Sequence, residues 1–588
     1  MSSNRLSIVD ATAQLTAPGQ MFEMDTATVL GTPMNVWKHA PATLRQILDL
    51  SLNHATSEFL VYEEQRLTFD EHYRQAATFA HRLVALDVQK GDRVAIAARN
   101  LPQWVVAFWG ALVVGAVAVP LNAWWTSDEL GYGLSDSGSK IVLVDEERLE
   151  RIRPLLDELE FVTTVIVISE DPSRPAQLGA PHARVAILDF QTLLGDVDPL
   201  QTPPDVAVDT DDDATMFYTS GTTGRPKGAV GTHRNLVTNL MNLFFIGQRA
   251  AMRLEESLDG DGPSPQNANL LNIPLFHATG CLAVMVVNTA AGGKVVMMHH
   301  FDAAKALALI EREHITMIGG VPTIAMQILD HPDFATFDTT TVRSVSYGGA
   351  PAPPELVKRI RAAFPKAQPG NGYGLTETSA AVALNNGPDY VERPRSCGVP
   401  VPVCEVAIVP ESFEGSEPPD DRPTGPEVLG EVWIKGPNVV RGYWHKPEAT
   451  AQSFTNGWLH TGDIGRIDDD GYLYIVDRAK DMIIRGGENV YSVTVEAAIF
   501  EHPAVTDCAV IGVPHPVLGE EVAAVIVLRA GRVIEAEELS RHVAQRLAKF
   551  EVPTVIMFRT DPLPRNPQGK VLKRELRASL LEQLQRGD

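Results

Sequence analysis

Cysteine is scarce in this chain, which has four among 588 residues. Cys281, Cys397, Cys404 and Cys508 show no C-x-x-C spacing, so the sequence supports neither a disulfide framework nor a cysteine zinc site. Reduced thiols are the usual state in the cytosol. We therefore expect a cytoplasmic protein.

Basic residues are also few relative to acidic ones. Lys and Arg total 50 against 74 Asp and Glu, giving a formal net charge of -24. A surface this acidic disfavours broad contact with nucleic acid or anionic lipid. We expect no nucleic-acid partner, and any anionic ligand has to be held by local donors.

The sequence also has little that is typical of targeting or membrane-spanning segments. Residues 1–10 contain Arg5 but no apolar core, so we expect no signal peptide there. The stretch from Val105 to Leu121 is nearly all apolar and has the length of a short membrane helix. Because Val117 to Pro120 is typical of a strand, we predict a buried helix followed by a buried strand, and no integral membrane segment.

The first half of the chain alternates helical patterns with short apolar runs. We predict strands at Val94–Ala98, Ile141–Val144, Val165–Ser169 and Arg184–Leu188. This alternation indicates βαβ units around largely parallel sheets, and hence an α/β fold. From about residue 481, strands at 508–513, 523–528 and 554–558 and a helix at 535–549 predict a small α+β domain.

The most informative stretch is Tyr218-Thr-Ser-Gly-Thr-Thr-Gly-Arg-Pro-Lys-Gly228. It follows a predicted strand, 214–218, and precedes a helical pattern from His233. Small residues and glycines let successive backbone N–H groups turn towards phosphate oxygens, and the hydroxyls and Lys227 add donors. The spacing is not that of a Walker A loop. We interpret the stretch as a phosphate-binding segment.

This segment resembles the signature of the adenylate-forming superfamily of acyl-CoA synthetases, nonribosomal adenylation domains and luciferases. Further matching segments follow in the family's order: Pro274–His277, Tyr347–Pro351, Asn371–Glu377, Thr461–Asp463, Asp477–Lys480 and Pro564–Lys570. Together they extend from about residue 214 to 574. The resemblance implies a large, multi-lobed N-terminal domain with mixed, largely parallel sheets, residues 1–479. It also implies a small mobile α+β domain, residues 480–588, with a hinge at Lys480.

The resemblance also implies a reaction and its participants. The family joins a carboxylate to ATP to form an acyl-adenylate, and then exchanges AMP for the thiol of coenzyme A. It implies ATP, Mg²⁺, coenzyme A and a small carboxylic acid as cofactors and partners. The oligomeric state stays open, with a homodimer as one alternative.

Site residues carry over motif by motif. The residues implied for ATP and AMP are Thr219, Ser220, Gly221, Thr222, Thr223, Gly224, Lys227, Gly349, Ala350, Pro351, Asn371, Gly372, Tyr373, Thr376, Asp463 and Arg478. Those implied for catalysis are Lys570 and His277, and those implied for the acyl pocket are His277, Tyr347, Gly348 and Gly374. The resemblance implies for coenzyme A and the hinge Lys480, Gly486 and Gly487, and for the metal Glu377 and Thr222.

The hinge segment departs from the family pattern at Ser492, where a proline is common, and at Thr494, where an acidic residue is common. We expect Ser492 to cap a helix that begins near Val495.

The acid is less well defined. His277 stands where amino-acid-activating relatives carry an Asp, which argues against α-amino acids. Gly374 stands where acetate-specific relatives carry a Trp, so we expect the missing ring to leave room for a longer acyl group. We predict a ligase for a medium-chain, long-chain or bulky hydrophobic acid. The alternatives are an acyl-AMP ligase that loads a free-standing carrier protein, a non-catalytic nucleotide-binding scaffold, and luciferase-type oxidation.

Overall fold

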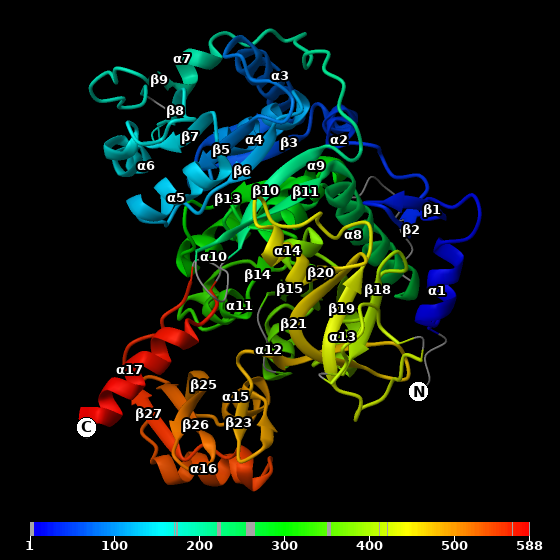
Figure 1. Cartoon of the computed structure of the whole chain (residues 1–588), viewed down its shortest axis with the longest axis vertical. Coiled ribbons are helices and arrows are strands. Elements are labelled where there is room, and N and C mark those ends of the chain that lie inside the picture. The colour runs from blue at the N-terminus through cyan, green and yellow to red at the C-terminus, as the bar shows by residue number, and fades with distance from the viewer. Residues whose placement is uncertain are drawn as a thin grey trace.

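The computed structural model describes residues 5–169, 171, 174–219, 225–254, 265–349, 354–410, 412–419, 421–566 and 569–586. Figure 1 shows a large body, coloured blue through yellow, with the orange and red C-terminal part at its lower end. We call residues up to Arg478 the large unit and residues from Ile483 the C-terminal unit.

The N-terminal segment packs along one long helix of the large unit. Helix α1 (Ile8–Leu15) contacts α8 (His233–Arg253), and the hairpin of β1 (Met24–Val29) and β2 (Thr32–Trp37) follows it. The Trp37 indole donates to Asn242 of α8 at 2.9 Å. This segment therefore braces the helix that begins beside the predicted phosphate-binding segment.

One sheet is ordered β11-β10-β6-β5-β7-β8-β9, and all its strand pairs are parallel except the antiparallel pair of β10 and β11. Its strands are β5 (Arg93–Ala97), β6 (Val117–Pro120), β7 (Ile141–Asp145), β8 (Thr164–Ile168), β9 (Ala186–Asp189), β10 (Asp213–Thr219) and β11 (Lys227–Thr232). The helices connecting and covering it are α3 (Phe69–Ala85), α4 (Pro102–Val113), α5 (Ser127–Ser137), α6 (Glu146–Ile152) and α7 (Phe190–Leu194). The four strands predicted in the first half are confirmed.

The apolar stretch at 105–121 forms α4 and β6, as predicted. Every residue of α4 is buried, because the helix packs against α3 and the sheet beneath. Within the described residues, no helix is both long and apolar enough to cross a membrane.

A second sheet is ordered β17-β16-β15-β14-β12-β13-β3-β4, with parallel pairing from β3 to β16. Its strands are β3 (Glu58–Tyr62), β4 (Gln65–Thr68), β12 (Ala268–Leu271), β13 (Lys294–Met297), β14 (Met317–Gly320), β15 (Ser344–Gly348), β16 (Gln368–Tyr373) and β17 (Ala383–Asn386). The helices associated with it are α2 (Leu44–Leu50), α8, α9 (Val286–Ala291), α10 (Ala303–Arg312), α11 (Pro322–Leu329), α12 (Pro354–Ala363) and α13 (Gly387–Glu392).

The third sheet of the large unit is antiparallel. It contains β18 (Glu405–Val409), β19 (Gly430–Lys435), β20 (Phe454–Thr455), β21 (Trp458–Ile467) and β22 (Leu473–Arg478), with α14 (Pro447–Ser453) beside it. Strand β22 is the last strand of the large unit, so the third sheet leads directly into the C-terminal unit.

The C-terminal unit has its own sheet and its own core clusters. Its strands are β23 (Ile483–Arg485), β24 (Glu488–Val490), β25 (Val505–His515), β26 (Gly519–Leu528) and β27 (Val555–Arg559). Its helices are α15 (Ser492–Phe500), α16 (Ala536–Ala544) and α17 (Lys573–Arg586). The predicted strands and helix of the tail are confirmed, although the helix at α16 is shorter than expected.

The predicted role of Ser492 is wrong. Helix α15 begins at Ser492 itself, and Tyr491 is the residue that precedes it. Ser492 has no side-chain capping bond to its own helix, and its hydroxyl instead contacts Asp477 of β22. The hydroxyl is directed towards the large unit because a carboxylate lies there.

Candidate active site

The predicted phosphate-binding segment connects two paired strands. Thr219 ends β10 and Lys227 begins β11, and the two residues are register partners. Strand β11 leads into α8, whose first turn is closed by a capping box between Thr232 and Asn235. The predicted residues Ser220, Gly221, Thr222, Thr223 and Gly224 lie outside the described residues.

Lys227 and Glu377 meet at one tyrosine. The Lys227 ammonium lies 4.2 Å from the centre of the Tyr443 ring, and the Tyr443 hydroxyl donates to Glu377 Oε1 at 2.8 Å. Burial and the charge of Glu377 both raise the pKa of Tyr443. Tyr443 was not predicted as a site residue, and its lone position before Trp444 carries no signal specific enough to find it.

Asp463 lies at the centre of a second set of contacts. It is buried in β21, opposite Arg478 of β22. Asp463 Oδ2 accepts from the Tyr373 hydroxyl at 2.8 Å, and Oδ1 pairs with Arg478 Nε at 3.0 Å. A carboxylate has about four acceptor positions, so it retains capacity for two neighbouring donors of a ligand.

The ends of β15 and β16 form the wall beside this carboxylate. A Cβ at Gly348 would lie 2.8 Å from the Gly372 carbonyl oxygen, so glycine allows the strands to approach. Gly349 follows with a φ of 71°, in the left-handed region. The Asn371 amide lies 3.8 Å from Cys397 Sγ, and Thr376 precedes Glu377 in a short 3₁₀ turn, Thr376–Thr378. Ala350 and Pro351 lie outside the described residues.

Lys570 enters this cluster from the C-terminal unit. A Cβ built on Gly349 would lie 3.7 Å from Lys570 Cε, and one on Gly569 would lie 2.7 Å from Val321 Cγ2 at the start of α11. The segment is held by a hydrogen bond from the Lys570 N–H to Asn566 Oδ1 at 2.9 Å. The C-terminal unit therefore contacts the large unit, with the Lys570 side chain directed towards Asp463 and Glu377.

Electrostatics confirm that these groups share one space. Burial, followed by the charge of Arg478, lowers the pKa of Lys570 to about 8, while Asp463 and Glu377 oppose that shift. Burial, followed by the charge of Lys570, lowers the pKa of His277 to about 3. The imidazole is therefore neutral near pH 7, beside an ammonium that is largely protonated.

The predicted hinge residues differ in their relation to this cluster: Lys480 interacts electrostatically with Lys570, whereas the glycine pair contacts only its own unit among the described neighbours. Lys480 occupies the turn between β22 and β23, and burial and then Arg478 lower its pKa. Gly486 and Gly487 form the β23–β24 turn with φ values of 63° and 89°. A Cβ at Gly486 would have Leu518 of the same unit as its nearest neighbour. The structure thus brings Lys570 to the large unit and leaves the glycine pair on the C-terminal unit.

Gly374 does not open space in the way the sequence suggested. A Cβ at Gly374 would lie 1.4 Å from the Ala380 carbonyl oxygen. The glycine is required because backbone occupies the position of a side chain, so the missing ring leaves no room there.

Tyr347, which the resemblance implied for the acyl pocket, points into the protein core. Its ring is buried in the core between β15 and α12, and its hydroxyl lies 2.9 Å from that of Tyr390. Side chains alternate along a strand, so half-buried Ser346 and Gly348 face the opposite side of β15. Any contribution of β15 to an acid pocket on that side comes from these two small residues.

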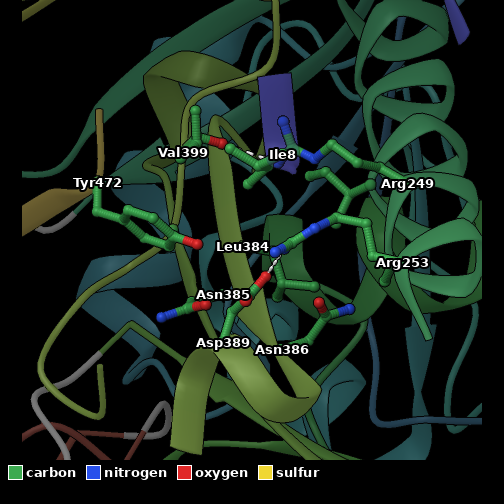
Figure 2. A pocket seen from close by; sticks show the side chains of 12 residues that line it. Ile8, Arg249, Arg253, Leu384, Asn385, Asn386, Asp389, Val399 and Tyr472 are labelled. Atoms are coloured by element: carbon green, nitrogen blue, oxygen red, sulfur yellow. Dashed lines mark hydrogen bonds and ion pairs between the residues drawn. The ribbon is translucent and has the colours of Figure 1, made fainter. Parts of the chain in front are cut away.

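A separate pocket lies at the other end of α8. Its described lining contains none of the predicted site residues. Figure 2 shows Arg253 paired with Asp389 and Arg249 beside them, and Arg249 donates to the Val399 carbonyl at 3.0 Å. With 21 residues, α8 is about 30 Å long, so this pocket is remote from Lys227. The two arginines anchor the end of the helix.

Sequence and structure comparisons agree with this geometry. Residues 51–444 match the family described as AMP-binding enzyme, and residues 494–570 match the AMP-binding enzyme C-terminal domain. The chain is 36% identical over 514 residues to a feruloyl-CoA synthase of Amycolatopsis, covering 87% of this chain and 93% of that protein. It is 35% identical over 515 residues to the long-chain-fatty-acid–CoA ligase FadD13 of Mycobacterium tuberculosis, with the same coverages.

Solved structures give the same result. The o-succinylbenzoate CoA synthetase of Bacillus subtilis, in complex with its acyl-adenylate intermediate, superposes with a TM-score of 0.71 at 30% identity. The match covers 90% of this chain and 97% of that one. The chain therefore belongs to the AMP-binding enzymes and is an acid–thiol ligase of the AMP-forming type.

Proposed function

We propose that this enzyme activates a hydrophobic monocarboxylic acid, a medium- or long-chain fatty acid or a bulky aromatic acid, as its adenylate and transfers it to coenzyme A. The observation that carries the proposal is the position of Lys570. This lysine of the C-terminal unit interacts with Asp463 and Glu377 of the large unit, and Glu377 is connected to Lys227 through Tyr443. The two ammonium groups of Lys570 and Lys227 suit the phosphates of a nucleoside triphosphate and a second anion. The two carboxylates suit its ribose hydroxyls and a bound cation.

In the first half-reaction, a carboxylate oxygen attacks the α-phosphorus of ATP and pyrophosphate leaves. Both reactants are anions, so their approach requires fixed positive charge. Lys570 would donate to both the acid and the α-phosphate, and Lys227 would hold the outer phosphates. Asp463 would accept from the ribose hydroxyls while Tyr373 and Arg478 keep its carboxylate in place.

Glu377 is the candidate contact for Mg²⁺. Within the part of the chain that the structure describes, Tyr443 is the one side chain that hydrogen-bonds to the Glu377 carboxylate, and it does so at Oε1, so Oε2 remains for a cation. Among the described residues there is no group of three or more His, Cys, Asp or Glu side chains suited to a metal. A single carboxylate fits Mg²⁺, which takes most of its remaining ligands from phosphates and water. When bound, the ion would neutralise phosphate charge.

The character of the acid follows from the neighbouring side chains. A neutral His277 offers no charge to pair with a substrate ammonium, which argues against amino acids. Two of the named relatives, the feruloyl-CoA synthase and the long-chain-fatty-acid–CoA ligase, are named for hydrophobic monocarboxylates, whereas the o-succinylbenzoate CoA synthetase is named for a dicarboxylate. Gly319 of β14 is the register partner of Ser346 and shares its face of the sheet, and a Cβ there would meet no described atom within 4 Å, which supports open space on that face.

The second half-reaction needs a different arrangement. With Lys570 in the site, Gly486 and Gly487 remain on the C-terminal unit away from the cluster. We infer a rotation about Lys480 that withdraws Lys570 and brings this glycine turn to the adenylate, where backbone without side chains lets the pantetheine arm approach. The unit boundary then falls at residues 479 and 480.

A panel of acids tests the proposal. Purified enzyme is incubated with ATP, Mg²⁺ and coenzyme A, and with a fatty acid series, hydroxycinnamates, 2-succinylbenzoate, acetate or amino acids. We expect acyl-CoA and AMP from hydrophobic monocarboxylates and the largest kcat/KM for one of them. A preference for acetate or an amino acid would contradict the acid assignment. Faster transfer to a phosphopantetheinylated carrier protein than to coenzyme A would favour a carrier-loading ligase.

A further inference from the structure

Asp477 and Ser492 are joined by two hydrogen bonds across the proposed hinge. Asp477 belongs to β22 of the large unit, and Ser492 is the first residue of α15 in the C-terminal unit. The Ser492 N–H donates to Asp477 Oδ2 at 2.5 Å, and the Ser492 hydroxyl donates to Oδ1 at 3.1 Å. The exposed fractions are 0% for Ser492 and 3% for Asp477. Water therefore does not compete for these bonds.

The same hydroxyl is connected to the segment that carries Lys570. Lys573, at the start of α17, donates to Ser492 Oγ at 2.7 Å and pairs with Glu496 Oε1 at 2.8 Å. Lys573 lies three residues after Lys570 in the chain. Ser492 thus contacts the large unit through Asp477 and the Lys570 segment through Lys573.

The residue type matters at this position. A first helical residue has an N–H with no partner inside its own helix, and here that N–H is given to Asp477. Proline, the common residue of the related segments, has neither an N–H nor a hydroxyl and would supply neither bond. Hydrogen bonds to a charged acceptor are the stronger kind. Burial raises the pKa of Asp477 to about 6, and Lys573 opposes the shift, so the carboxylate is mainly charged at neutral pH.

We infer that Ser492 is a positioning residue, whose paired hydrogen bonds to Asp477 hold the C-terminal unit in the arrangement that places Lys570 in the adenylation site. The inference rests on the proposed rotation about Lys480. Because the hinge lies between Asp477 and Ser492, rotation has to break both bonds. The contact therefore favours the first half-reaction and has to open before the second.

Half-reactions measured separately test this role. Ser492→Ala removes the hydroxyl donor and should lower acid-dependent pyrophosphate exchange by about tenfold. Ser492→Pro removes both donors and should lower it by about 100-fold. Thioester formation from supplied acyl-adenylate should stay unchanged or rise. Ser492→Thr keeps both donors and should restore the wild-type ratio of the two rates. An equal fall in both half-reactions, or no change in either, would overturn the inference.

A distance measurement makes the test independent of turnover. Lys358 of α12 and Lys549 of the C-terminal unit are exposed, and the four native cysteines are buried. Spin labels on Lys358→Cys and Lys549→Cys should give a narrow distance distribution in the otherwise wild-type chain and a broader one with Ser492→Pro. Identical distributions would contradict the inference even if no acid were turned over. A failure of the proposed function would appear separately, as absence of adenylate from every acid.

Discussion

Replacing Lys570 should separate the two half-reactions. Lys570→Ala removes the ammonium and the stem, whereas Lys570→Met keeps most of the stem and removes only the charge. The structure places this ammonium beside Asp463 and Glu377, in surroundings dry enough to bring its pKa to about 8. An ammonium in such surroundings is a stronger donor than one in water, because charges interact more strongly at low dielectric.

The magnitude follows from the loss of one preorganised donor at a developing charge, which costs about 10²–10³-fold in rate, or about 2.7–4 kcal/mol. We expect adenylate formation to fall by at least this factor in both variants. Thioester formation from supplied acyl-adenylate should remain close to wild type, because the proposed rotation removes Lys570 from the site before that step.

The assay has two parts. Acid-dependent exchange of labelled pyrophosphate into ATP measures the first half-reaction, and release of AMP from acyl-adenylate plus coenzyme A measures the second. Lys549→Ala, an exposed lysine of the same unit, is the matched control and should leave both rates unchanged. Equal losses in both half-reactions for Lys570→Met would refute the reasoning, since they would place Lys570 in the site throughout the cycle.

Further predictions concern pH, nucleotide binding, the hinge and stability. Because Lys570 loses its proton as the pH rises through about 8, kcat/KM for adenylation should fall above that pH, and Lys570→Met should lack this limb. Asp463→Asn should raise the KM for ATP by about 10–100-fold, matching the 1.5–3 kcal/mol of a hydrogen bond to a charged group, with little effect on the KM of the acid. Lys480→Pro should slow thioester formation more than adenylation, because proline restricts φ at the hinge. Gly374→Ala should lower the free energy of unfolding by about 1–3 kcal/mol, because its Cβ would overlap the Ala380 carbonyl.

Each of these has an outcome that would contradict it. A flat profile from pH 7 to 10 would remove Lys570 as the titrating group. An unchanged KM for ATP in Asp463→Asn would place the ribose elsewhere. Faster thioester formation in Lys480→Pro would argue against a hinge at that residue. An unaltered denaturation midpoint for Gly374→Ala would show that the loop at Ala380 yields without cost.

The sequence was most informative where one segment determines its own structure. Short apolar runs such as Val165–Ser169 are typical of buried strands in a parallel sheet, and they form β8 and its neighbours. The ordered motifs around Thr219, Asp463 and Lys570 predicted residues that the fold brings to one place, because each motif has its own local geometry.

Contacts between segments that are distant in the sequence cannot be predicted from local sequence patterns. Tyr443 connects Lys227 and Glu377 only because the loop after β19 folds over β11. The local sequence predicts that Ser492 caps its own helix, because nothing near Ser492 in the sequence indicates the buried carboxylate of Asp477 on β22. The missing side chain at Gly374 predicts open space in the acyl pocket, whereas the Ala380 backbone occupies that position in the structure.

In the proposed first half-reaction, Lys570 and the large unit together direct a carboxylate at the α-phosphorus of ATP. A carboxylate labelled with heavy oxygen in both positions tests it directly. If the acid attacks the α-phosphorus, one labelled oxygen remains in AMP after the acyl group is transferred to coenzyme A, and mass spectrometry of the AMP will detect it. Unlabelled AMP, or label recovered in inorganic phosphate together with ADP, would contradict the account.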